Sequence, residues 1–198
     1  MTKIIGITGG IASGKSLVSH YLETQGYPIV DADVVAREVV AKDSAGLKRI
    51  EEEFGQTVID ADGQLARKRL GQIVFADHGQ LRRLNAIMQP LIRERIISHL
   101  NALREQGAKV AFLVAPLLFE QSYQSLCDEI VVVYVSPQTQ LQRLMQRDQL
   151  TQSAAQERIN AQWPLKQKVQ QADIIINNDE GPDQTREQVA AWLKRTIA

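Results

Sequence analysis

Residues 9–16, which read GGIASGKS, limit what this chain can fold into more than any other stretch. They match the pattern G-x-x-x-x-G-K-[ST], with the apolar run KIIGIT before them and a helical pattern from Lys15 to about Thr24 after them. In such a strand–loop–helix unit, loop N–H groups and the helix N-terminus converge on phosphate oxygens. The sequence therefore predicts a nucleoside triphosphate site after a short buried strand.

Each residue type in this phosphate loop (residues 9–16) has a predicted task. Its glycines let the backbone approach the phosphates closely. Lys15 is expected to reach the β- and γ-phosphates, and the Ser16 hydroxyl is expected to be a ligand of Mg²⁺. The predicted nucleotide contacts in and beside the loop are Gly9, Gly10, Ile11, Ala12, Ser13, Gly14, Lys15, Ser16 and Leu17.

Strand and helix patterns alternate along the rest of the chain, which predicts an α/β fold. Five strands are expected, in the segments KIIGIT, YPIVDAD, AKVAFLVAPLLFE, EIVVVYV and ADIIIN. They should form a five-stranded parallel sheet with helices on both faces. A helix should start at Ser136-Pro137, where a capping serine precedes a proline. Another helix should start at Ser153, which can form a capping box with Gln156. A last amphipathic helix should bury Val189, Trp192, Leu193 and Ile197.

One kinase-like folding unit is expected over residues 1–198, in three parts. The core comprises residues 1–33, 107–136 and 173–198, a helical lobe of about 34–106 is inserted for the acceptor, and a helical lid covers about 137–172. In the lid, Arg143 and Arg147 lie four residues apart on one helix face. Such a pair is often only a solvated face, but beside a phosphate loop phosphoryl transfer needs a mobile cation.

Two acids end the second predicted strand. Asp31 and Asp33 alternate along what reads as an extended segment, so both side chains can face one site. One of them can take a proton from an attacking hydroxyl, although helix caps or a solvated strand end would also explain the pair. A GTPase switch is not favoured, since the guanine-reading pattern N/T-K-x-D is absent.

The amino-acid composition limits the kinds of partner and compartment that the chain is expected to have. Lysine plus arginine and aspartate plus glutamate number 23 each, which argues against a nucleic-acid partner held by bulk charge. The single cysteine excludes an intrachain disulfide and fits a reducing compartment. The N-terminal residues lack a signal-peptide pattern, and no apolar run is long enough to span a membrane. A cytoplasmic protein is expected, as a monomer or weak homo-oligomer.

Several segments together resemble the dephospho-coenzyme A kinase family over nearly the whole chain. They are GITGGIASGKS, DADVVAREVV, PLLFE, VSPQTQLQRLMQRD, ERINAQ and ADIIINN. The resemblance implies ATP-dependent phosphorylation of the ribose 3′-hydroxyl of dephospho-coenzyme A, the last step of coenzyme A synthesis. It places the catalytic base at Asp33 and a lid arginine at Arg143, with Lys15 as the third catalytic residue. It also implies that adenine binds near the turn after IIINN, at Asn177 to Gly181, with Asn177 and Asn178 as the candidate contacts.

Two positions depart from the family pattern. Leu17 stands where the family often has threonine, and Gln89 stands where a histidine usually precedes a proline. The predicted acceptor contacts are Asp31, Asp33, Arg37, Gln89 and Arg93. Two other readings remain open from sequence alone: a nucleoside or nucleotide kinase of the same fold, and a nucleotide-binding regulator without acceptor chemistry.

Overall fold

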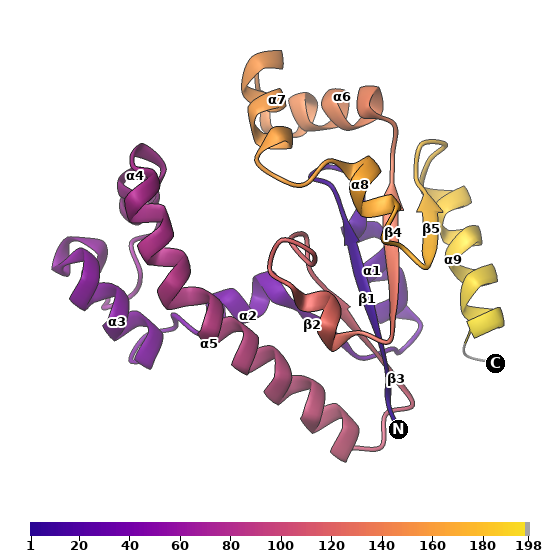
Figure 1. Ribbon diagram of the computed structural model, residues 1–198, viewed down its shortest axis with the longest axis horizontal. Helices are drawn as coiled ribbons and strands as arrows, with labels where there is room; N and C mark the ends of the chain where they lie inside the picture. The colour runs from indigo at the N-terminus through magenta and orange to yellow at the C-terminus, as the bar shows by residue number, and fades with distance from the viewer. Residues whose placement is uncertain (197–198) are drawn as a thin grey trace. The chain divides into compact units, whose positions relative to one another are not determined.

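The computed structural model describes residues 1–196, so Ile197, one of the predicted core positions, lies outside the described residues. Five strands form one sheet in which every neighbouring pair is parallel, in the order β2-β3-β1-β4-β5 (Figure 1). The strands are β1 (Lys3–Gly9), β2 (Ile29–Asp31), β3 (Val110–Val114), β4 (Glu129–Tyr134) and β5 (Ile174–Asn177). The predicted five-stranded parallel sheet is confirmed.

Helices occupy the segments between and after the strands. The α-helices are α1 (Lys15–Thr24), α2 (Ala32–Glu38), α3 (Ala45–Phe54), α4 (Arg67–Ala76), α5 (His78–Glu105), α6 (Pro137–Asp148), α7 (Gln152–Asn160), α8 (Leu165–Val169) and α9 (Pro182–Thr196). Two short 3-10 helices, η1 (Gln56–Val58) and η2 (Tyr123–Leu126), complete the elements of the described residues. The chain divides into two compact units, one of Met1–Asp31 with Ala102–Ala198 and one of Ala32–Asn101.

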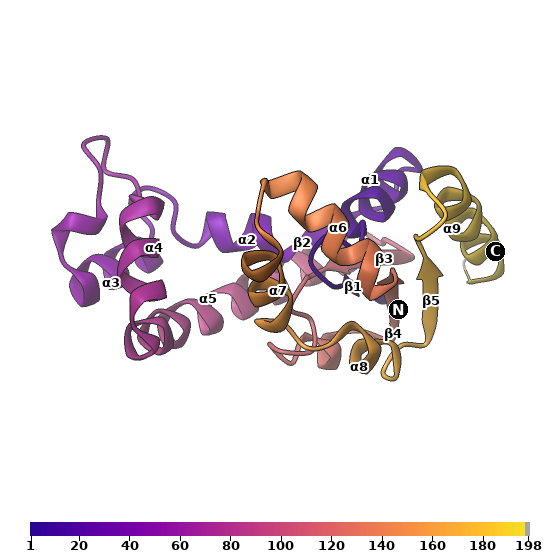
Figure 2. The same ribbon diagram turned by 90° about the horizontal axis from the view of Figure 1, so that it is seen from above.

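The first unit is a sheet covered on both faces. Alternate strand residues pack with α1 and α9 in one buried cluster, in which Phe112 meets the edges of Tyr27 and Trp192. Figure 2 shows α8 on the side of the sheet away from α1. On that opposite face, Gly6 has no Cβ, which lets Leu118 and Cys127 approach within 2.8 Å of where a Cβ would be. The two-sided burial explains why the strands read as continuous apolar runs.

The second unit is helical and has its own core. Five buried residues from α3, η1, α4 and the segment that follows α2 form one cluster; they are Val40, Ile50, Val58, Leu70 and Val74. Within this unit, Glu38 at the end of α2 accepts hydrogen bonds from Arg95 Nε (3.0 Å) and pairs with His99 Nε2 (2.8 Å) on α5. The hydrogen bond with His99 is the main cause that lowers the pKa of the Glu38 carboxyl.

Two local predictions are wrong. Asp33 does not continue a strand: β2 ends at Asp31, and α2 begins at Ala32. Ala32 and Val35, three residues apart, are both buried, and Asp33 lies in the first helical turn, where an acid is favoured by the helix dipole. The helix α7 begins at Gln152 with Thr151 as its cap, whose hydroxyl accepts from the Ala154 N–H at 3.3 Å, so Ser153 is inside the helix.

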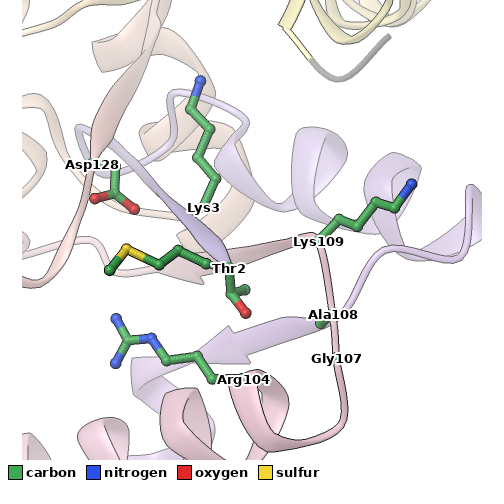
Figure 3. A pocket seen from close by; sticks show the side chains of 8 residues that line it. Thr2, Lys3, Arg104, Gly107, Ala108, Lys109 and Asp128 are labelled. Carbon is green, nitrogen blue, oxygen red and sulfur yellow. The ribbon is translucent and has the colours of Figure 1, made fainter.

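A cavity of about 740 Å³ lies at the amino ends of the strands (Figure 3). Residues just before β1, β3 and β4 line it, and Asp128 there accepts a hydrogen bond from the Ile4 N–H at 2.7 Å. The phosphate loop follows the other, carboxyl end of β1, so this cavity is separate from it. No helix among residues 1–196 is both long and apolar enough to cross a membrane.

Candidate functional site

The phosphate loop connects the carboxyl end of β1 to the N-terminus of α1. Gly14 caps α1 with a φ of 91°, and Ala12 has a φ of 59°. For a residue with a Cβ this left-handed conformation costs roughly 1–2 kcal/mol, so the surroundings must hold Ala12 in place. The N–H groups of Lys15 and Ser16, the first two residues of α1, come before the regular hydrogen bonds of the helix and can bind an anion. Lys15, at the first position of α1, is half-buried.

Three glycines of the loop have no room for a side chain. A Cβ on Gly9 would meet the Ser13 hydroxyl and lie 2.8 Å from the Val133 carbonyl oxygen. A Cβ on Gly10 would meet the Gln140 amide, and one on Gly14 would meet the Asn178 amide. The glycines predicted for approach to phosphate are therefore also required by protein groups that pack behind the loop.

Asn178, which follows β5, is one of these groups. It is buried, its Nδ2 donates to the Ser13 carbonyl at 2.8 Å, and its Oδ1 accepts from the Thr185 hydroxyl at 2.7 Å. Both side-chain polar atoms of Asn178 are thus bonded within the protein, where they support the phosphate loop. Asn177 beside it is exposed, and its backbone exchanges two hydrogen bonds with Gln188.

Arg143 on α6 lies beside the same turn. Its NH2 donates to the Asn178 carbonyl at 2.9 Å. Burial disfavours the charge of neighbouring Asp179, but hydrogen bonds from Thr139 and the Ser136 N–H, together with the charge of Arg143, hold the pKa of that carboxyl below its ordinary value. By contrast, Arg147 is exposed and forms an ion pair with Asp148, with 2.7 Å between Nε and Oδ1. Of these two arginines of α6, Arg143 is therefore the one held next to the phosphate loop, by the carbonyl of Asn178.

A buried ion pair, which sequence reasoning did not identify, lies behind the loop. Lys168 on α8 is fully buried; its Nζ is 2.8 Å from Glu120 Oε1 and donates to the Pro116 carbonyl at 2.8 Å. Burial is the main cause that lowers the pKa of the Lys168 ammonium, with a further contribution from the charge of Lys15. In the part of the chain that the structure describes, Glu120 Oε2 is buried without a hydrogen-bond partner.

Replacing Lys168 by methionine should lower the free energy of unfolding by about 3–5 kcal/mol, because Glu120 is left buried without its counter-charge. Denaturation by urea measures this change. The double variant Lys168→Met with Glu120→Gln should recover part of the loss, and Lys166→Met, at an exposed position of the same helix, should cost little. A single variant as stable as the parent would show that the pair does not contribute as described.

The predicted acceptor residues lie on the second unit, apart from Asp31 at the end of β2. Asp33 and Arg37 are one helical turn apart and exposed on α2. Gln89 and Arg93 are one turn apart and half-buried on α5. Pro90, which follows Gln89, is inside α5. The predicted site residues are thus divided between the two units.

Several residues in or behind the loop's surroundings had no direct signal in the sequence. Gln140 and Gln162 bond the backbone of Ile11, and Glu120 pairs with Lys168. A glutamine in a helix is normally expected to be exposed to solvent. Gln140, however, lies four residues before buried Leu144, which places it on the buried face of α6. For Glu120, an acid directly after the apolar run PLLF was the available signal.

Comparisons with known proteins agree over the length of the chain. The family model described as dephospho-CoA kinase matches residues 3–184. A dephospho-CoA kinase from Enterococcus faecalis is 43% identical over 197 residues, covering 100% of this chain and 98% of the relative. One from Lactiplantibacillus plantarum is 46% identical over 194 residues, with 98% of each chain covered.

A solved structure shows the same fold. The dephospho-CoA kinase from Campylobacter jejuni superposes with a TM-score of 0.77 at 27% identity, covering 98% of this chain and 97% of the other. The match spans both the sheet with its phosphate loop and the helical insertion. The chain therefore belongs to the dephospho-CoA kinase family.

Proposed function

We propose that this protein transfers the γ-phosphoryl group of Mg·ATP to the ribose 3′-hydroxyl of dephospho-coenzyme A, giving coenzyme A and ADP. The observation that carries the proposal is the phosphate loop at the start of α1, found in a chain of the dephospho-CoA kinase family. A kinase of this family has an acceptor, which argues against a nucleotide-binding regulator. The same membership favours dephospho-coenzyme A over nucleosides or nucleoside monophosphates as the acceptor.

The donor side of the site fits a nucleoside triphosphate. The N-terminus of α1 supplies backbone N–H groups, Lys15 a cation and Ser16 an exposed hydroxyl. One hydroxyl is a suitable protein contribution for Mg²⁺, which usually keeps several waters and is otherwise bound through substrate phosphates. The bound ion would neutralise charge on the phosphate oxygens. For adenine, the turn from Asn177 remains the proposed contact.

The acceptor side rests on residues of the second unit. Asp33 is proposed as the base that accepts the proton of the 3′-hydroxyl, with Asp31 close to it in sequence. Arg37 and Arg93 supply positive charge for the phosphates of dephospho-coenzyme A. Gln89 supplies an amide, which donates and accepts hydrogen bonds without titrating near neutrality. A cytoplasmic location and a monomeric or weakly associating state remain predictions.

Replacing Arg143 by alanine should lower kcat by more than it weakens ATP binding. The guanidinium is proposed to stabilise charge that develops during transfer, and an interaction made mainly in the transition state affects turnover most. Steady-state kinetics and calorimetric titration with ATP separate the two quantities. Arg147→Ala is the matched control, because Arg147 is on the same helix but is paired with Asp148. Equal losses in both variants would argue against a special role for Arg143.

Product analysis tests the donor and metal together. The purified protein, dephospho-coenzyme A and ATP should yield coenzyme A, identified by mass spectrometry, only when Mg²⁺ is present. Chelation with EDTA should stop turnover, and added Mg²⁺ should restore it. Phosphorus NMR should place the new phosphate on the 3′ position. A product phosphorylated elsewhere, or turnover undiminished by EDTA, would contradict the proposal.

A further inference from the structure

Two glutamine side chains hold one residue of the phosphate loop from both sides. The Ile11 N–H donates to Gln162 Oε1 at 2.9 Å, and Gln140 Nε2 donates to the Ile11 carbonyl at 2.9 Å. The glutamines are more than 125 residues away from Ile11 in sequence, at separations of 129 and 151. We call Gln140 and Gln162 the glutamine bracket.

The loop needs such support at this position. Ala12, the next residue, is in the left-handed region at a φ of 59°, which residues with a Cβ rarely adopt. A short loop relaxes from this conformation unless neighbouring groups fix it. Gly10, on the other side of Ile11, has no Cβ and so leaves space for the Gln140 amide. The bracket therefore fixes the loop between a glycine that makes room for it and a strained alanine.

Both glutamines are themselves held firmly. Gln140 is 5% exposed and lies in the first turn of α6, whose cap Ser136 donates its N–H to Asp179 at 2.9 Å. Next to Gln162, the Trp163 N–H donates to Glu120 Oε1 at 2.9 Å. The Trp163 ring stacks on the ring of Phe119, with 6.0 Å between the ring centroids. Glu120 in turn pairs with buried Lys168. The bracket thus connects the loop to two anchored segments of the first unit.

The two hydrogen bonds of the bracket lie beside a mostly apolar cavity, which increases their contribution to holding the loop. Both glutamines line a cavity of about 740 Å³ between the end of β4, the start of α6 and the segment from α7 to α8. Apart from the glutamines, most of its lining is apolar, from side chains such as Val135, Ile159, Leu165 and Val169. An amide in such a place finds few other partners, so its bond to the loop is worth more than one in open solvent.

We propose that Gln140 and Gln162 are positioning residues that prepare the phosphate loop for the binding of ATP. They set the backbone of Ile11 so that the N–H groups of the phosphate loop are already arranged for the triphosphate before it binds. They also join the loop to α6 and to the residue that follows α7 by two direct bonds. The inference rests on the proposed binding of ATP at this loop, and neither side chain needs to touch the nucleotide.

The test uses Gln140→Met and Gln162→Met, which keep side-chain length and remove the hydrogen-bonding amide. Gln142→Met on α6 and Gln167→Met on α8 are matched controls at exposed positions of the same segments. Each bracket variant should raise the dissociation constant for ATP, measured by calorimetry without acceptor, by about fivefold to tenfold. The kcat at saturating ATP should change little, because the lost bonds support bound nucleotide equally before and during transfer.

Hydrogen exchange of the nucleotide-free protein gives a second readout. Peptides covering residues 9–17 should exchange faster in both bracket variants and at the parent rate in both controls. The inference is supported if exchange and ATP dissociation constant both rise, and overturned if either stays at the parent value. It is also overturned if Gln162→Met binds ATP more tightly, because Gln162 would then compete with phosphate for the Ile11 N–H. A parent protein that does not bind ATP would contradict the proposed function, whereas the exchange rates still test the bracket.

Discussion

Asp33→Asn should lower kcat by about 10²- to 10⁴-fold, the usual contribution of a general base. The amide preserves the size and the hydrogen bonding of the side chain but cannot accept the proton of the attacking hydroxyl. Asp33 lies exposed in the first turn of α2, so the substitution should leave folding nearly unchanged. Steady-state kinetics with dephospho-coenzyme A measures kcat, and calorimetry should find ATP binding near the parent affinity.

Asp31→Asn is the matched control for this assignment. Asp31 ends β2, two residues earlier, and carries the same functional group. The loss of turnover should be smaller than in Asp33→Asn. If Asp31→Asn proves more damaging, the roles of the two acids are reversed. A loose transition state reduces the need for a base, so an Asp33→Asn effect at the lower end of the range is also consistent with proton acceptance.

Lys15→Ala should lower kcat by about a hundredfold or more, as expected when a cation is removed from the transferring charge. Lys15 is half-buried at the start of α1, and the buried residues of that helix, Val18 and Leu22, are not altered. Circular dichroism and thermal unfolding should therefore show a folded protein. The rate of ADP release under saturating substrates gives kcat.

Lys194→Ala, at an exposed position of α9, is the control for the loss of one positive charge. Its turnover should match that of the parent. A folded Lys15→Ala variant that keeps more than half of the parent activity would contradict the assignment of residues 9–16 as the phosphate loop. A variant that is inactive because it has unfolded would be recognised by its lost circular dichroism signal, and Lys15→Arg then tests the same contact in a folded protein.

The features predicted correctly from the sequence depend on local patterns. The loop and helix α1 follow from glycine, lysine and serine at fixed spacing, and the helix was expected to span the residues it does span. The β-branched run EIVVVYV indicated β4 because a strand covered on both faces has no polar alternation. Ser136 before Pro137 correctly predicted the start of α6, because serine is favoured as a helix cap and proline at the first helical position.

Asp33, the second of the two acids after the second strand, shows where prediction from local sequence patterns fails. Asp33 was expected on an extended segment, but the burial of Ala32 and Val35, three residues apart, fits a helix directly after β2. The alternative of a helix cap came closer, since Asp31 directly precedes α2 and Asp33 lies in its first turn. Three residues of strand are too few for alternation to identify the element.

The groups that support the loop could not be predicted because their partners are distant in sequence. Asn178 bonds Ser13 across 165 residues, and Lys168 bonds the Pro116 carbonyl across 52. Asn178 was predicted as a contact of adenine, whereas its amide atoms are bonded to Ser13 and Thr185. A single sequence identifies a residue type beside a site, but only the folded chain shows which atoms it bonds.

The most direct test is a measurement of ADP release by the purified protein with Mg·ATP over three acceptors, side by side. With dephospho-coenzyme A, kcat/KM should exceed the values for adenosine and for AMP by orders of magnitude, and mass spectrometry should detect coenzyme A as the product. Equal or faster turnover of adenosine or AMP would contradict the assignment and identify the protein as a nucleoside or nucleotide kinase of the same fold.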